Sequence, residues 1–102
     1  MITIDTIKNE LEDIKYYYSR REMFDKAFSS VGKNEILQTV DRYNAVICSA
    51  PPKVYEMYVA LYVDGCTYEA AAESLCYSTN YIYKTNKRIV EFFYKAMNKE
   101  AA

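Results

Sequence analysis

Side chains that could contact DNA gather between positions 78 and 88, where an amide, two tyrosines and three basic residues follow one another closely. An amide can pair with adenine through two hydrogen bonds, and a tyrosine can touch a thymine methyl group or bind a phosphate. Lysine and arginine neutralise phosphates. Each of these residues alone is more often a solvated helix residue, but together they indicate DNA binding. The candidate DNA-binding residues are Ser78, Thr79, Asn80, Tyr81, Tyr83, Lys84, Lys87 and Arg88.

Charge is divided unevenly along the chain, although its net value is only −1. From residue 48 to 77 one lysine stands against four acidic residues, a balance of −3. From residue 78 to 102 five basic residues stand against two glutamates, a balance of +3. Positive charge is therefore concentrated where a DNA-binding helix would need it. Lys95 and Lys99 are interpreted differently, because they complement the dipole at the end of the last helix.

Catalytic and metal chemistry finds few suitable residues in this chain. There is no histidine, and the three cysteines form no close pair, so we expect no zinc or other metal site, no cofactor and no enzymatic activity. Glu10, Glu12 and Asp13 are interpreted as a solvated acidic face rather than a catalytic pair. The odd number of cysteines favours a reducing compartment. Without a basic-then-apolar leader or an apolar run of the ~20 residues that cross a bilayer, we expect a cytoplasmic protein with no membrane partner.

The elements that must position these residues are predicted to be helices. Of the 102 residues 51% are hydrophobic, and only two glycines and two prolines interrupt the chain, which favours an all-α fold around one core. We expect a single domain over residues 1–102. A helical hairpin over 1–50 and a helix-turn-helix subregion over 51–102 are divided by Pro51 and Pro52.

Two helices are predicted before the prolines. Thr3 caps the first, whose narrow apolar stripe is Ile4, Ile7, Leu11, Ile14 and Tyr18, continued by Phe24, Ala27, Phe28 and Val31. Because the heptad pattern is short, we expect this stripe to pack within the chain rather than form a dimer seam. Gly32 marks a break. Asn34 then caps a second helix to about Ile47, whose buried face is Ile36, Leu37, Val40, Tyr43 and Ile47.

Three helices are predicted after the prolines. The first runs from Pro52 to about Val63 and is followed by Gly65. Thr67 caps a short helix with an inner face of Ala71, Ala72 and Leu75. After a turn at 76 and 77, Ser78 caps the last helix, about 78–97, with Ile82, Ile89 and Phe93 facing inward. A helix-turn-helix of this kind places its second helix in the DNA major groove.

The stretch from Pro52 to Phe93 resembles region 4 of sigma-70-type factors. The pattern is a helix ending in an aromatic residue and Asp-Gly, then Thr-x-Glu-x-x-Ala-x-x-Leu, a turn, and Ser-x-x-x-Val/Ile. Its positions hold Tyr62, Asp64, Gly65, Thr67, Glu69, Ala72, Leu75, Ser78 and Ile82. With the long first helix, the layout is similar to small phage-encoded regulators of the ArpU and RinA type. Cys76 replaces the glycine or polar residue common in the turn, so a left-handed turn there would carry strain.

The expected function is a DNA-binding transcriptional regulator of phage or prophage origin. The resemblance implies promoter DNA as the partner and RNA polymerase as a second candidate partner. A homodimer through the N-terminal helices would supply a second half-site. Two alternatives remain open: a small-terminase-like DNA packaging protein, and a protein-interaction module that keeps the helical fold without binding DNA.

Overall fold

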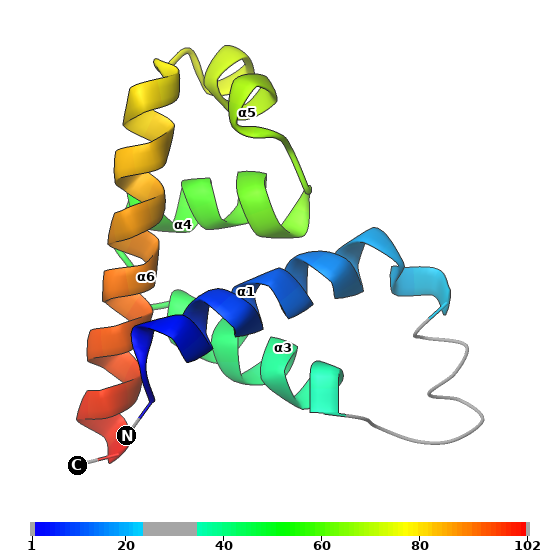
Figure 1. Cartoon of the computed structure of the whole chain (residues 1–102), viewed down its shortest axis with the longest axis vertical. Coiled ribbons are helices and arrows are strands. Elements are labelled where there is room, and N and C mark those ends of the chain that lie inside the picture. Colours follow the sequence, from blue (N-terminus) through cyan, green and yellow to red (C-terminus); the bar gives the residue numbers. More distant parts are fainter. Residues whose placement is uncertain (1, 24–34, 102) are drawn as a thin grey trace.

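The computed structural model describes residues 2–23 and 35–101 of the chain, and every regular element in those ranges is a helix. The predicted all-α fold is confirmed. Two helices come from the N-terminal half and the rest follow Pro51 (Figure 1). The elements are α1 (Ile4–Ser19), α3 (Glu35–Ile47), α4 (Pro52–Tyr58), the π-helix η1 (Val59–Val63), α5 (Tyr68–Leu75) and α6 (Thr79–Ala101). No helix among these residues has the length and apolarity needed to span a membrane.

α6 is the longest helix, and α1, α3, α4 and α5 all pack against it (Figure 1). The predicted inward residues Ile82, Ile89 and Phe93 are each 0% exposed, so this prediction is confirmed. Thr85 fills the same stripe, because its hydroxyl donates a hydrogen bond to the carbonyl of Tyr81 at 2.8 Å and leaves its methyl group to pack. Buried residues from both sides of the prolines join in one core around this face of α6.

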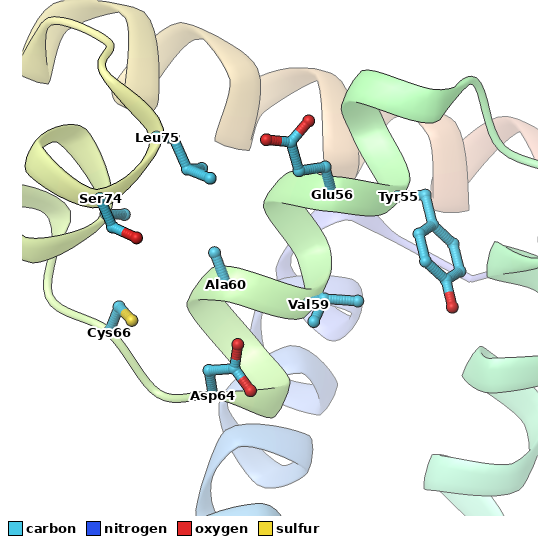
Figure 2. Close-up of a pocket in the computed structure, with 9 residues that line it drawn as sticks. Tyr55, Glu56, Val59, Ala60, Asp64, Cys66, Ser74 and Leu75 are labelled. Carbon is cyan, nitrogen blue, oxygen red and sulfur yellow. The ribbon is translucent and has the colours of Figure 1, made fainter.

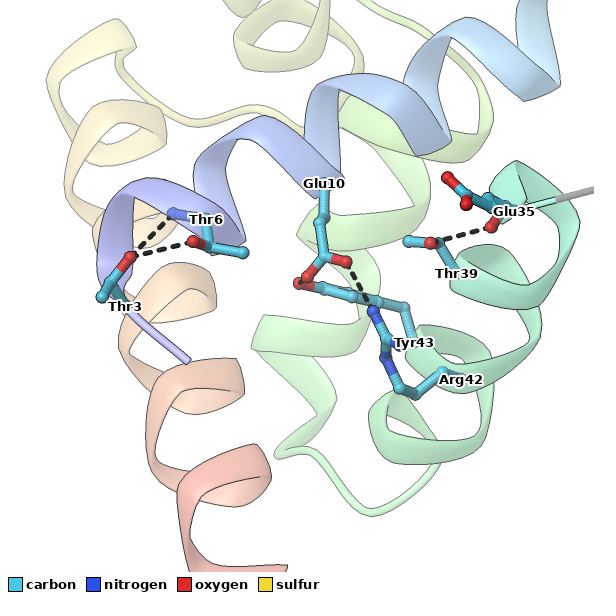
Figure 3. Close-up of polar contacts among 7 residues, drawn as sticks. All are labelled: Thr3, Thr6, Glu10, Glu35, Thr39, Arg42 and Tyr43. Carbon is cyan, nitrogen blue, oxygen red and sulfur yellow. Dashed lines mark hydrogen bonds and ion pairs between the residues drawn. The ribbon is translucent and has the colours of Figure 1, made fainter. Parts of the chain in front are cut away.

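α1 begins as the sequence predicts, because the Thr3 hydroxyl accepts a hydrogen bond from the backbone N–H of Thr6 at 3.2 Å (Figure 3). The predicted stripe is confirmed in its centre, where Ile7, Leu11 and Ile14 are fully buried against the chain's own helices. Its two ends differ from the prediction. Ile4 is 41% exposed and Tyr18 is half-buried, whereas the neighbouring Tyr17 is buried.

One carboxylate fixes α1 to α3. Glu10 accepts hydrogen bonds from Nη2 of Arg42 at 2.5 Å and from the hydroxyl of Tyr43 at 2.8 Å (Figure 3). Its side chain is only 20% exposed. The expectation that Glu10 is merely solvated is therefore wrong, because α3 brings a cation and a phenol to it. Glu12 and Asp13 are exposed as expected.

α3 buries Val40, Tyr43 and Ile47 as predicted, with Val46 in addition. Ile36 and Leu37 are only half-buried, because the core lies beside the last turns of this helix. The predictions for Phe24, Ala27, Phe28, Val31, Gly32 and Asn34 lie outside the described residues.

α4 begins at Pro52 as predicted, but the predicted helix to Val63 ends as the π-helix η1. The backbone N–H of Asp64 donates to the carbonyl of Val59 at 2.8 Å, five residues back. A π-turn is wider than an α-turn, and here three consecutive residues are buried: Ala60, Leu61 and Tyr62. Gly65 then reverses the chain with a φ of +69°.

The N-terminal end of the described chain is fastened to α6, near its C-terminal end (Figure 1). The backbone N–H of Ile2 donates to Oδ1 of Asn98 at 3.0 Å. Nδ2 of Asn98 donates in return to the carbonyl of Ile2 at 3.1 Å. A single amide thus binds both polar groups of one backbone residue.

Candidate nucleic-acid interface

α5, a tight turn and α6 form the segment that carries the candidate residues. Thr67 caps α5, because its hydroxyl accepts from the N–H of Ala70 at 3.1 Å. Cys76 ends α5 in the left-handed conformation with a φ of 61°, and the N–H of Tyr77 returns to the carbonyl of Ala72 at 2.9 Å. The hydroxyl of Ser78 then accepts from the N–H of Tyr81 at 3.2 Å. The predicted caps and the predicted left-handed turn are confirmed.

The inner face of α5 is confirmed only in part. Ala71 and Ala72 are buried, and their small side chains allow α5 to lie close to α6 and η1. Leu75 is half-buried, because it lines a groove of about 360 Å³ between α5 and the α4–η1 segment (Figure 2). Glu56 and Asp64 stand at this groove, and the exposed ring of Tyr55 lies at one end of it.

The face of α6 opposite the buried stripe carries most of the candidate residues. Six of the eight are exposed: Ser78, Asn80, Tyr83, Lys84, Lys87 and Arg88. Asn80, Lys84 and Lys87 are spaced four and three residues apart, which places them on one side of the helix. No acidic side chain within the described ranges forms an ion pair with Lys84, Lys87 or Arg88. Their charge is therefore available to an external anion.

The other two candidates, Thr79 and Tyr81, are half-buried, so the expectation that both lie largely outward is corrected. The ring of Tyr81 packs on the ring of Tyr77 with centroids 4.4 Å apart. On the other flank of α6, the ring of Tyr83 meets the ring of Tyr68 edge to face, with centroids 4.5 Å apart. Two tyrosine pairs thus border the exposed face of α6.

Asn86 connects this region to the core. The hydroxyl of Tyr62 in η1 donates to Oδ1 of Asn86 at 2.5 Å, and Nδ2 of Asn86 donates to the hydroxyl of Tyr68 at 3.0 Å. Burial raises the pKa of Tyr62 well above its ordinary value, and burial followed by repulsion from Tyr83 raises the pKa of Tyr68. All three groups therefore stay neutral at physiological pH.

Sequence reasoning missed Tyr68, Tyr77 and Asn86 as parts of this region. Asn86 offered a weak signal, because an amide in the middle of an otherwise apolar helix stripe needs buried partners. Lys8 of α1 was also missed. It lines a groove of about 340 Å³ with Tyr83 and Lys87, and no local pattern connects residues so far apart in the chain.

Metal binding finds no support in the part of the chain that the structure describes, which contains no cluster of three acidic or cysteine side chains that could hold an ion. The three cysteines are free thiols.

No protein-family model, curated protein or solved structure matches this chain.

Proposed function

We propose that this chain is a DNA-binding transcriptional regulator of the phage or prophage kind and that α6 is its DNA-reading helix. The observation that carries the proposal is the group of three exposed basic residues, Lys84, Lys87 and Arg88, that have no acidic partner among the described residues. Asn80 lies on the same side of α6, one turn before Lys84. α5 and the turn at Cys76 precede this helix as they would in a helix-turn-helix motif.

The division of labour follows from the position of each residue along α6. Asn80 and Tyr83, in the first turns, would contact base edges in the major groove. Lys84, Lys87 and Arg88 would bind phosphates and set the register on the duplex. The half-buried Tyr81 is suited to a contact at the border of the interface rather than at its centre.

Three phosphate contacts give modest affinity at physiological salt. A second DNA-binding copy or RNA polymerase would supply the remainder through a linked contact. The resemblance to sigma region 4 favours polymerase. For a homodimer, the buried centre of the α1 stripe leaves the exposed end at Ile4 and other surfaces of the N-terminal helices as the available area.

Selection of bound sequences from a random duplex pool, begun at low salt, tests this proposal. We expect enrichment of one short sequence, because Asn80 discriminates adenine from the other bases. Binding without enrichment would reduce the protein to a non-specific DNA binder, and no binding at low salt would reject the proposal.

A protein-interaction module is the second candidate, and one observation favours it. The groove between α4, η1 and α5 has an apolar floor of Val59, Ala60 and Leu75 and exposes the ring of Tyr55 (Figure 2). A protein partner would bury these residues, as aromatic anchors are buried in interfaces. Tyr55→Ala would weaken such a partner while leaving DNA binding unchanged, which separates the two candidates.

A further inference from the structure

Tyr83 is the most exposed large apolar side chain of α6, at 54%, yet its ring is not free. It meets the edge of the Tyr68 ring at an interplanar angle of 80°. Tyr68 is fixed by Asn86, and Asn86 is fixed by the buried Tyr62. A continuous series of contacts therefore runs from the π-helix η1 to an aromatic ring at the surface.

The directions of the hydrogen bonds in this series are defined. Tyr62 donates its only hydroxyl hydrogen to Oδ1 of Asn86, and Nδ2 of Asn86 must then face Tyr68. The reverse orientation of the amide would place Nδ2 against a hydroxyl that is already positioned to donate. Because both ends of the amide are satisfied in one orientation, Tyr68 has a fixed position beside α6.

A fixed neighbour limits the rotamers of Tyr83. Edge-to-face aromatic pairs contribute about 0.5–1.5 kcal/mol beyond their buried area, which is enough to favour one rotamer of an exposed ring up to roughly ten-fold. A ring ordered before binding loses less entropy when it meets a ligand. An exposed tyrosine without this neighbour would lose that entropy on binding.

We propose that Tyr83 reads the methyl group of a thymine in the major groove and that Tyr68, fixed by Asn86, positions the Tyr83 ring for that contact. The inference rests on the proposed function and deepens it by naming one specificity contact. Tyr83 lies one turn after Asn80 and one turn before Lys87, so its ring projects between a base-reading amide and a phosphate-binding lysine. An apolar ring face complements a thymine methyl group and carries no charge to attract phosphate.

The experiment measures the affinity for the selected DNA site after each thymine is replaced in turn by deoxyuridine, which removes only the methyl group. At one position we expect about a four-fold loss for the unmodified protein, the value of one buried methyl group. Tyr83→Ala binds both sites equally at that position. Tyr68→Leu reduces the loss below about two-fold, whereas Tyr68→Phe, which keeps the ring pair, retains it.

A double-mutant cycle separates positioning from general stability. In the Tyr83→Ala background, Tyr68→Leu should have no further effect on the thymine-to-deoxyuridine ratio, because Tyr68 acts through Tyr83. Tyr55→Ala removes an equally exposed tyrosine from α4 and should leave the ratio intact. If Tyr68→Leu does not fold, Asn86→Ala replaces it with the same expectation.

Three results would overturn the inference while DNA binding stands: no sensitive thymine at any position, a full loss in Tyr83→Ala, or a full loss in folded Tyr68→Leu. An unmodified protein that binds no DNA at low salt rejects this inference together with the proposed function.

Discussion

Glu10 of α1 accepts a hydrogen bond at 2.8 Å from the hydroxyl of Tyr43, and the ring of Tyr43 packs on Phe93 of α6 with centroids 4.6 Å apart. Tyr43 and Phe93 are both 0% exposed. One tyrosine therefore joins three helices, with its polar end on α1 and its apolar ring on α6. The N-terminal helices owe their attachment to α6 in part to this side chain.

Glu10→Ala should lower the free energy of unfolding by about 1–3 kcal/mol, because it leaves the buried hydroxyl of Tyr43 without an acceptor. Urea denaturation at neutral pH measures the change. Asp13→Ala removes an exposed carboxylate from the same helix and should stay within about 0.5 kcal/mol of the unmodified chain. Equal effects of the two substitutions would show that the contact with Tyr43 contributes nothing.

The stability of the protein should fall as pH rises above about 10, the ordinary tyrosine pKa. Burial, the largest cause in each case, raises the pKa of Tyr43, Tyr58 and Tyr62 in the folded protein. The folded state then holds these three protons more tightly than the unfolded chain does. Their contribution is complete below pH 10 and declines progressively above it, at up to about 4 kcal/mol per pH unit for three groups.

Thermal unfolding midpoints between pH 8 and pH 11 test this expectation. Tyr43→Phe removes one of the three hydroxyls and should reduce the slope by about a third. A slope that is the same in Tyr43→Phe would assign the alkaline loss of stability to other groups.

Cys76→Gly should raise the free energy of unfolding by about 0.5–1 kcal/mol. Among the described residues, Cys76 is the one non-glycine residue with a positive φ, and glycine adopts that conformation without the steric cost of a Cβ atom. Part of the gain is offset by the greater freedom of glycine in the unfolded chain. Cys76→Ala keeps the Cβ atom and should change stability little, so an equal gain from alanine would refute the strain at this turn.

Simultaneous replacement of Lys84, Lys87 and Arg88 by alanine should weaken DNA binding and reduce the salt slope by about 2.7, because each phosphate that is no longer neutralised lowers it by about 0.9. Fluorescence anisotropy of a labelled duplex over a series of salt concentrations measures the slope. Lys53→Ala, an exposed base on α4, is the matched single control against Lys84→Ala. A slope that responds equally to both single replacements would remove α6 from the interface.

Local patterns predicted much of this fold because the local forces agree with the global one. The caps at Thr3, Thr67 and Ser78 depend on a hydroxyl and a backbone N–H three residues later, so the sequence alone defines them. The inward stripe of α6 follows from helical periodicity. The left-handed turn at Cys76 followed from its position in a familiar motif rather than from its residue type.

Contacts between distant residues escaped prediction. Glu10 has the surroundings of a solvated acid in sequence, and only the crossing of α3 brings Arg42 and Tyr43 to it. The exposure of Tyr81 was overestimated because periodicity does not reveal that Tyr77 covers its ring. The π-turn at Val59–Val63 has no local sequence rule, since it serves the packing of Tyr62 beneath α6.

The pairing of Ile2 with Asn98 has a consequence for the protein during its synthesis. The ribosome adds about 5–20 residues per second, so several seconds pass between the emergence of α1 and that of the residues that complete its surroundings. Throughout that interval the nascent chain exposes Ile7, Leu11 and Ile14. We expect a chaperone to protect this segment until α6 has been made.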